Sequence, residues 1–85
     1  MNYNIVFTTQ AEIDLKEAIN WYEKKRDLLS WEYREDIRIT IDKIIDDRIE
    51  YQMYSGNIRK IKLVKFPYNL YYLKDSAQMK ITRIC

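Results

Sequence analysis

The segment that most constrains the fold reads RKIKLVKFPYNLYY and occupies residues 59–72. Its first half alternates basic with apolar side chains, and a period of two is typical of a β-strand that buries one face. Pro67 interrupts the alternation, and an aromatic run follows. The sequence therefore predicts two strands, residues 58–66 and 68–73, joined by a turn at the proline.

The alternation also assigns side chains to faces. Ile61 and Leu63 are the natural core pair of the first strand, so Lys60 and Lys62 are expected on the opposite face. One helical hairpin cannot cover both sides of a sheet in so short a chain, so one sheet face should stay partly open. Lysines beside tyrosines on such a face suit an anionic partner, but they are also ordinary on a solvated sheet.

The region before this segment predicts a strand and two helices. Residues 3–8 alternate as a strand. Thr9 begins a capping-box pattern, and a first helix follows it to about residue 26. A break at residues 27–30 separates it from a second helix at residues 31–49. So short a break makes the two helices antiparallel neighbours.

The region after the helices completes the pattern. A turn at Ser55-Gly56-Asn57 precedes the two strands, a loop at residues 74–77 follows them, and residues 79–84 form a last strand. The predicted fold is α+β, in the order β-α-α-β-β-β. A helical hairpin packs on a mostly antiparallel sheet.

Composition indicates one folded domain over residues 1–85. The chain is 47% hydrophobic with one Gly and one Pro, and it has no apolar run of membrane-spanning length and no signal-peptide pattern. Its one cysteine, Cys85, is expected at a frayed end, and histidine is absent, so we expect no metal or other cofactor. These features are typical of a bacterial cytoplasmic protein that has no membrane contact.

Charge is divided unevenly along the chain. Residues 57–85 hold seven of the 15 Lys and Arg residues and a single acid, Asp75, so they carry +6. Residues 1–56 carry eight bases and 12 acids, a net −4. The basic, tyrosine-rich third is therefore the expected contact surface for a target or a nucleic acid. Its candidate contact residues are Arg59, Lys60, Lys62, Lys65, Tyr71 and Arg83.

Two blocks of the sequence resemble the RelE/ParE toxin superfamily. Residues 5–9 (IVFTT) and 11–15 (AEIDL), followed by Trp21-Tyr22, resemble its start. Residues 59–72 resemble its most recognisable block, in which basic and apolar residues precede Phe-Pro-Tyr and an aromatic strand. The resemblance covers nearly the whole chain in order. The helical hairpin and antiparallel sheet of that superfamily agree with the element order predicted above.

The resemblance implies the toxin of a type II toxin–antitoxin pair, a class linked to plasmid stabilisation and neutralised by a small cognate antitoxin. The RelE branch cleaves messenger RNA in the ribosomal A site, without a metal, and the ParE branch inhibits DNA gyrase. Lys60 and Lys62 match the strand lysines of RelE-like sites. For the antitoxin we expect a groove beside the helical hairpin, lined by Trp21, Tyr22, Trp31 and Tyr33.

Two departures from the RelE pattern favour the ParE-like branch. Asn69 stands where an Arg is usual, which removes a cation near the phosphate. The sequence reads Arg83-Ile84-Cys85 where RelE-like enzymes continue with residues that complete the active site, and loss of a general acid or base typically costs ~10²–10⁴-fold in rate. Two alternatives stay open: a ribosome-dependent RNase in which Tyr71 or Tyr72 transfers the proton, and an inactive relative that still binds an antitoxin.

Overall fold

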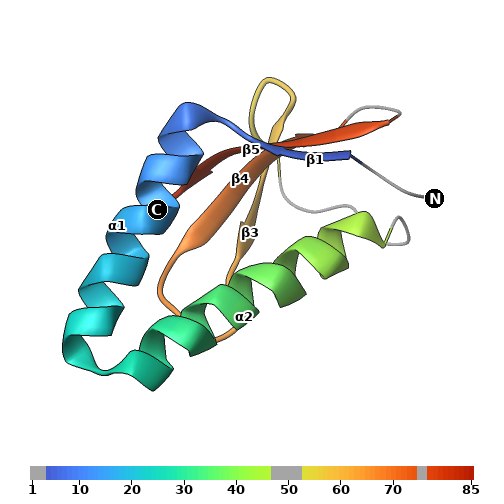
Figure 1. Ribbon diagram of the computed structural model, residues 1–85. Coiled ribbons are helices and arrows are strands. Elements are labelled where there is room, and N and C mark those ends of the chain that lie inside the picture. Colours follow the sequence, from blue (N-terminus) through green and yellow to red (C-terminus); the bar gives the residue numbers. More distant parts are fainter. Residues whose placement is uncertain (1–3, 47–52, 75–76) are drawn as a thin grey trace.

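The computed structural model describes residues 4–46, 53–74 and 77–85, and shows two helices packed on a five-stranded sheet (Figure 1). Its elements are β1 (Asn4–Phe7), α1 (Thr9–Lys25), α2 (Asp27–Ile45), β2 (Met53–Ser55), β3 (Ile58–Lys62), β4 (Asn69–Lys74) and β5 (Gln78–Ile84). The predicted α+β class and helical hairpin are confirmed.

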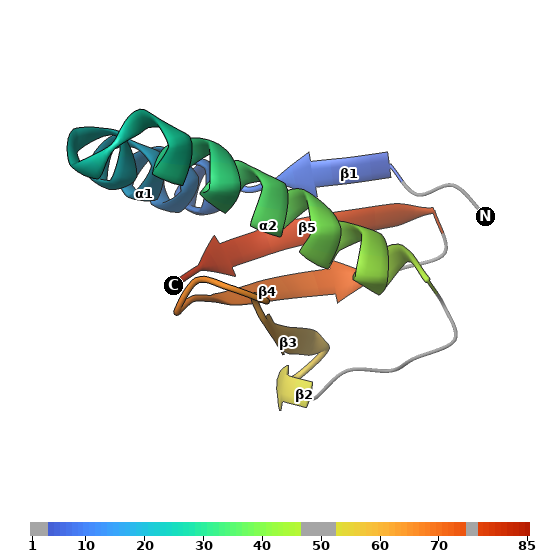
Figure 2. The same ribbon diagram turned by 90° about the horizontal axis from the view of Figure 1, so that it is seen from below.

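The strands lie in the order β1-β5-β4-β3-β2, side by side as seen in Figure 2. β1 pairs with β5 in parallel, and the other neighbours pair antiparallel. The sheet is therefore mostly antiparallel, as predicted. β5 lies between β1 and β4, although it is the last strand in the chain.

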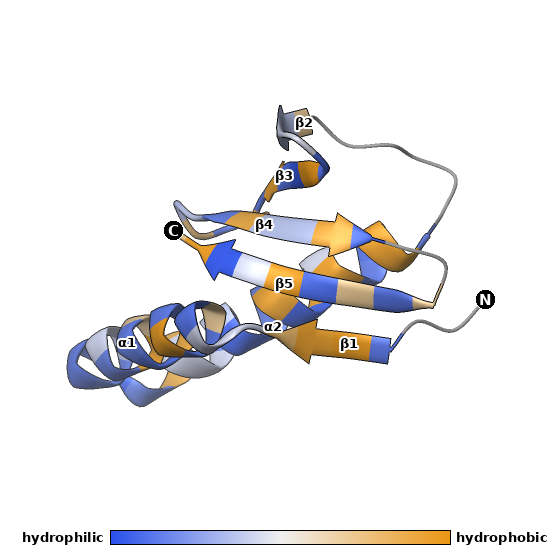
Figure 3. Cartoon of the chain, turned by 90° about the horizontal axis from the view of Figure 1, so that it is seen from above, coloured by the Kyte–Doolittle hydropathy of each residue, from blue (hydrophilic) through white to orange (hydrophobic). Residues whose placement is uncertain are grey.

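Alternating burial shows that the helices cover one sheet face. In β5 the apolar Met79, Ile81 and Ile84 are buried, whereas Lys80 and Arg83 are exposed. Figure 3 shows the same alternation of hydrophilic and hydrophobic residues along β5. Burying one face and solvating the other is the usual arrangement of an antiparallel sheet.

The core lies between this covered face and the hairpin. α2 contributes a stripe at steps of three and four residues, formed by Tyr33, Ile37, Thr40 and Ile44. α1 approaches the sheet through small residues, and Ala11 and Ala18 are its two buried positions. The strands complete the core with Ile61, Leu70, Tyr72, Met79, Ile81 and Ile84, and the segment after β3 adds Leu63 and Phe66.

The start of α1 differs from the prediction by one residue. Thr8, not Thr9, is the N-cap, because its backbone is still extended and its hydroxyl accepts the amide of Ala11 at 3.1 Å. The same hydroxyl donates to the carbonyl of Thr82 on β5 at 2.9 Å. The contact with Thr82 therefore favours Thr8 over the adjacent Thr9 as the N-cap.

The helical hairpin is tighter than predicted. α1 ends at Lys25 and α2 begins at Asp27, so only Arg26, in an extended conformation, separates them. The predicted break at residues 27–30 is wrong, because Asp27 begins α2 and its carbonyl accepts the hydroxyl of Ser30 at 2.9 Å. α2 ends at Ile45. The rest of its predicted extent, residues 47–49, lies outside the described residues, as do residue 3 of the first predicted strand and residues 75–76 of the last loop.

The sheet contains one strand that was not predicted. β2 pairs with the start of β3 across a turn at Gly56, whose φ of +55° favours glycine. The turn was predicted, and β2 forms its other arm.

β3 is shorter than predicted because the buried carboxylate of Asp36 takes over the backbone amides that follow it. Its two oxygens accept hydrogen bonds from Val64 at 2.9 Å, Lys65 at 2.8 Å and Phe66 at 3.0 Å. Because these amides donate to a side chain, they do not continue the hydrogen bonding between strands, so β3 ends at Lys62. This contact ties the β3–β4 connection to α2.

Candidate interaction face

The sheet face away from the helices carries the basic and aromatic side chains. We call it the open face, and its side chains are Tyr54, Ile58, Lys60, Lys62, Tyr71, Leu73, Lys80 and Arg83. All of them are exposed or partly exposed. No Asp or Glu lies in any strand of the described residues. The predicted placement of Lys60 and Lys62 opposite the buried Ile61 is therefore confirmed.

Strand register aligns the central residues of the open face in one row. Lys60 on β3 is the cross-strand partner of Tyr71 on β4, and Tyr71 is the partner of Arg83 on β5. Directly paired residues have Cβ atoms about 4.5–5.5 Å apart. Lys62 pairs with Asn69 in the next row. Two lysines, a tyrosine and an arginine thus converge from three strands.

A β-bulge brings Arg83 into that row. Tyr71 pairs with Arg83, but Tyr72 pairs with Ile81, so Thr82 is the additional residue. Its hydroxyl donates to the Tyr71 carbonyl at 3.2 Å. A bulge of this kind reorients the next side chain.

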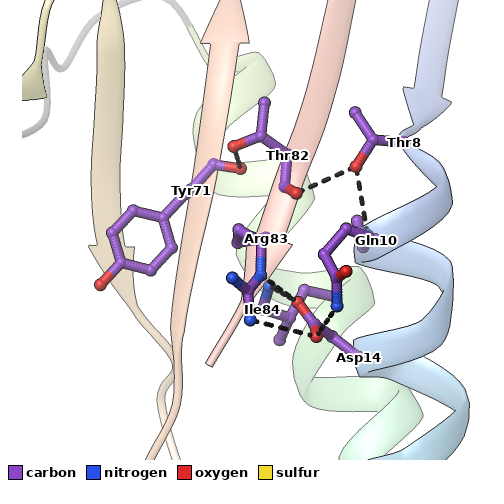
Figure 4. Close-up of polar contacts among 8 residues, drawn as sticks. Thr8, Gln10, Asp14, Tyr71, Thr82, Arg83 and Ile84 are labelled. Carbon is purple, nitrogen blue, oxygen red and sulfur yellow. Dashed lines mark hydrogen bonds and ion pairs between the residues drawn. The ribbon is translucent and has the colours of Figure 1, made fainter.

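Helix α1 holds Arg83 through a salt bridge (Figure 4). The Nε atom of Arg83 donates to Asp14 at 2.8 Å, and the Ile84 amide donates to the same carboxylate oxygen at 3.0 Å. Gln10 donates to its other oxygen at 3.1 Å. The Asp14 side chain is only 9% exposed, whereas that of Arg83 is 48% exposed. Asp14 therefore fixes both the guanidinium and the end of β5.

These contacts set the protonation state of Asp14. Burial by itself raises the pKa of this carboxyl group, but the hydrogen bonds from Arg83, Ile84 and Gln10 outweigh it and leave the pKa below its ordinary value. Arg83 in turn has a raised pKa, chiefly because of the hydrogen bond to Asp14. The pair stays ionised at neutral pH.

The tyrosines of the open face pack against each other. The rings of Tyr54 and Tyr71 meet edge to face, with centroids 4.8 Å apart and planes at 72°. Lys60 Nζ lies 5.9 Å from the centroid of the Tyr54 ring. Partial burial, followed by the neighbouring Cys85 and Tyr54, raises the pKa of Tyr71 despite the opposing effect of Arg83. At neutral pH its hydroxyl is protonated, so it is a hydrogen-bond donor and not a general base.

Two predicted contact residues lie elsewhere. Arg59 shares the Ile61 side of β3 and lines another depression, with Lys74 and Gln78 and with the open-face residues Leu73 and Lys80. Lys65 follows β3 and lies beside Trp31 of α2. The structure therefore brings Lys60, Lys62, Tyr71 and Arg83 together, but not Arg59 and Lys65.

The residues expected in the antitoxin groove do not share one groove. Trp21 is 56% exposed and lines a depression between α1 and the end of β5. Trp31 is 60% exposed and lines another, with Ile39 and Val64. Both are surface residues.

The two tyrosines of that predicted groove belong instead to an aromatic cluster. Tyr33 is 0% exposed and packs edge to face on Phe66 and Tyr68, at 5.3 and 5.2 Å between centroids. Tyr22 is half-buried beside them, and burial together with its hydrogen bond to Tyr68 raises its pKa to about 12. Burial also raises the pKa of Tyr33. Tyr33 has no surface with which to touch a partner.

Besides the apolar Ile58 and Leu73, two open-face residues with polar groups, Lys80 and Tyr54, were not among the predicted contact residues. Lys80 lies between the buried Met79 and Ile81 and pairs with Leu73. The alternation of apolar and polar residues in β5 would therefore have predicted that Lys80 lies on the open face. Tyr54 precedes the Gly56 turn. Its position on the open face could be predicted only by recognising β2 as the strand before that turn.

Within residues 4–46, 53–74 and 77–85, no helix is long and apolar enough to cross a membrane. In the same part of the chain, no group of three or more His, Cys, Asp or Glu side chains is placed to hold a metal ion.

The elements together define an α+β fold of two helices on one face of a five-stranded mixed sheet, with a basic open face. This fold is similar to that of a chain in the solved structure of the chromosomal ParDE toxin–antitoxin system from P. aeruginosa. The two align with a TM-score of 0.76 over 96% of this chain and 92% of that chain, at 15% sequence identity. No family model and no curated protein matches the sequence. The similarity shows a shared fold.

Proposed function

We propose that this chain is the toxin of a type II toxin–antitoxin pair and inhibits DNA gyrase in the ParE manner. The observation that carries the proposal is the open face, on which Lys60, Lys62, Lys80 and Arg83 gather without an acid among the described strand residues. The fold shared with a chain of a ParDE structure supports it. Its site of action is the bacterial cytoplasm, where gyrase works.

Three features of the site support a protein contact over catalysis. Tyr71 has a raised pKa and cannot accept a proton at neutral pH. Arg83 already shares its charge with Asp14, which lowers its capacity to stabilise a developing phosphorane. Asn69, the partner of Lys62 across the sheet, is uncharged. The row of groups is thus well suited to binding an anion and poorly suited to general base catalysis.

Induced expression of paired variants tests the proposal. Expression of the wild-type chain should arrest growth with filamentation and an SOS response, and the purified protein should inhibit supercoiling by gyrase. Lys60→Glu with Lys62→Glu should abolish both effects without unfolding the domain. The matched control is Lys24→Glu with Lys43→Glu, two exposed helix lysines, which gives the same net charge and should stay toxic. Toxicity that survives reversal at Lys60 and Lys62 would show that the open face is scaffold.

A ribosome-dependent RNase is the second candidate, favoured by the alignment of Lys60, Tyr71 and Arg83 in one row. In this case Lys60 and Arg83 hold the RNA phosphate, and the protonated Tyr71 donates to the leaving group. Expression would then stop translation quickly and leave cuts at codon boundaries in ribosome-bound messenger RNA. Tyr71→Phe would remove that activity, whereas it should leave gyrase inhibition nearly intact. Normal growth on expression would exclude both active candidates and leave the third alternative, an inactive relative that binds an antitoxin.

The cognate antitoxin is proposed to dock on the helical hairpin. Trp21 and Trp31 expose large apolar surfaces there, and such residues are frequent anchors in protein interfaces. Tyr22 is accessible at the edge of the site, and Tyr33 supports it from the core. Co-expression with the protein encoded next to this chain should restore growth. Trp21→Ala with Trp31→Ala should weaken that rescue while the toxin stays active.

A further inference from the structure

The open face has a small depression between β2, β4 and the end of β5. It is lined by Tyr54, Ile58, Tyr71, Thr82, Arg83 and Cys85, and its volume is about 140 Å³. A cavity of about 150 Å³ holds one benzene molecule. The depression therefore has room for a single apolar side chain.

The two tyrosines form walls of this depression, and they pack on each other. A base stacks face to face on an aromatic ring. Here the edge of one ring meets the face of the other, and Lys60 lies over the Tyr54 ring. The two rings are therefore not parallel, and protein already lies over part of this pair.

The surroundings of the depression are cationic. Lys60 lies beside it, next to Tyr54 and Tyr71, and Arg83 forms part of its wall. Lys62 and Lys80 lie farther along β3 and β5 on the same open face. Lys60 and Lys62 are two residues apart on one strand, which separates them by roughly 6.6 Å. Alternate carboxylates on an extended polypeptide have the same spacing.

We propose that the depression binds one apolar side chain of an acidic, extended polypeptide segment, and that alternate carboxylates beside this side chain pair with the surrounding lysines. The inference rests on the proposed function in one respect: the target of the open face is a protein. It adds the chemistry of the recognised segment, which alternates acids around a central apolar anchor. Such an anchor in a pocket ringed by polar contacts is a common interface arrangement.

Labelled peptides test this directly by fluorescence polarisation. One peptide has a central leucine between two runs of glutamate, a second has alanine in place of the leucine, and an oligothymidylate of equal charge represents nucleic acid. The leucine peptide should bind about tenfold more tightly than the alanine peptide, because the leucine buries more apolar surface. All three affinities should fall with added salt. Equal affinity for the two peptides, or tighter binding of the oligothymidylate, overturns the proposal.

Variants locate the binding site. Ile58→Glu places a carboxylate in the depression and should remove the preference for leucine over alanine. Ile39→Glu, on the exposed surface of α2, is the matched control and should keep that preference. Loss of the preference in both variants overturns the location. The comparison of peptides on the wild-type protein needs no variant, so it decides the proposal even if Ile58→Glu does not fold.

The outcome is separable from that of the proposed function. Preference for the leucine peptide without gyrase inhibition would keep the depression as a peptide site and discard gyrase as the target. Gyrase inhibition with equal affinity for both peptides would discard the depression and keep the proposed function.

Discussion

Asp36 is the residue on which the β3–β4 connection depends. Its carboxylate is 3% exposed and accepts three backbone amides, from Val64, Lys65 and Phe66. Buried amides that lose a charged acceptor are costly, because water cannot reach them to replace it. Asp36 therefore stabilises the connection that places Lys62 at the end of β3.

Asp36→Ala should destabilise the domain by roughly 3 kcal/mol or more. Urea denaturation followed by circular dichroism measures this change. Asp42→Ala is the control, since that carboxylate is exposed and pairs with the exposed Arg38, and it should change stability by less than about 1 kcal/mol. A similar cost for both substitutions would contradict the role of Asp36.

Asp14 should give the protein a stability that depends on pH. Its pKa is lowered in the folded protein, so its contribution is present above the unfolded value of roughly 3.9 and is lost as the pH falls through the folded value. Asp14→Asn should therefore be less stable than the wild type at neutral pH, and the difference should shrink in acid. Urea midpoints measured from pH 7 down to acid test this. Glu12→Gln, an exposed neighbour on α1, should not change the profile.

The sequence predicted neither of these carboxylate roles, for a physical reason. The amides that Asp36 accepts are 28 to 30 residues away, and Arg83 is 69 residues from Asp14. Helical periodicity places a carboxylate on a face of its own helix, but it does not say which loop packs there. Lys60 and Lys62, by contrast, were placed correctly because strand alternation is a local rule.

At the scale of elements, α1 completes an edge of β5. β1 ends at Phe7, so the last residues of β5 extend beyond their parallel neighbour. The Thr8 hydroxyl then donates to the Thr82 carbonyl, and Asp14 accepts the Ile84 amide. The first turns of the helix thus satisfy backbone groups that a longer β1 would have paired.

Thr8→Ala should cost about 1–2 kcal/mol, because it removes both the helix cap and the bond to Thr82. Thr9→Ala, at the exposed first position of α1, should change stability by less than about 0.5 kcal/mol. Thermal unfolding of the two variants gives the comparison. A larger loss for Thr9→Ala would support the capping box expected from the sequence and contradict the observed cap.

The elements themselves were predictable where periodicity was long. Both helices, β1 and the three C-terminal strands follow from apolar spacing. β2 was missed because Met53–Ser55 is exposed throughout and its three residues are too few to show an alternation. The predicted break at residues 27–30 was wrong for a different reason. The local sequence of these residues indicates the end of a helix, but packing of the hairpin keeps them helical.

At the scale of the whole molecule, charge is separated between the two layers. The strands contain no acid within the described residues, whereas α1 and α2 carry nine Asp and Glu residues. The net charge of +2 conceals this separation. Association with a partner responds to the local potential of a face more than to the sum.

Cation-exchange chromatography should reveal the separation. Lys60→Glu with Lys62→Glu and Lys24→Glu with Lys43→Glu have identical net charge. The first pair should elute at clearly lower salt, because it disrupts a face on which cations gather and whose described strand residues include no acid. Elution of the two variants at the same salt concentration would mean that retention depends on net charge and not on the position of the charges. The acids near Lys24 and Lys43 already weaken retention through that layer.

The position of β5 in the sheet has a consequence for the order of folding. β5 is made last and lies between β1 and β4, and the residues it joins to β1 are 74 positions apart. β1 therefore has no described neighbour to pair with until synthesis of the final strand, and long-range pairing of this kind is slow. During translation the helical hairpin is available before the sheet. A partner that recognises the hairpin alone could then engage the nascent chain before its basic face is assembled.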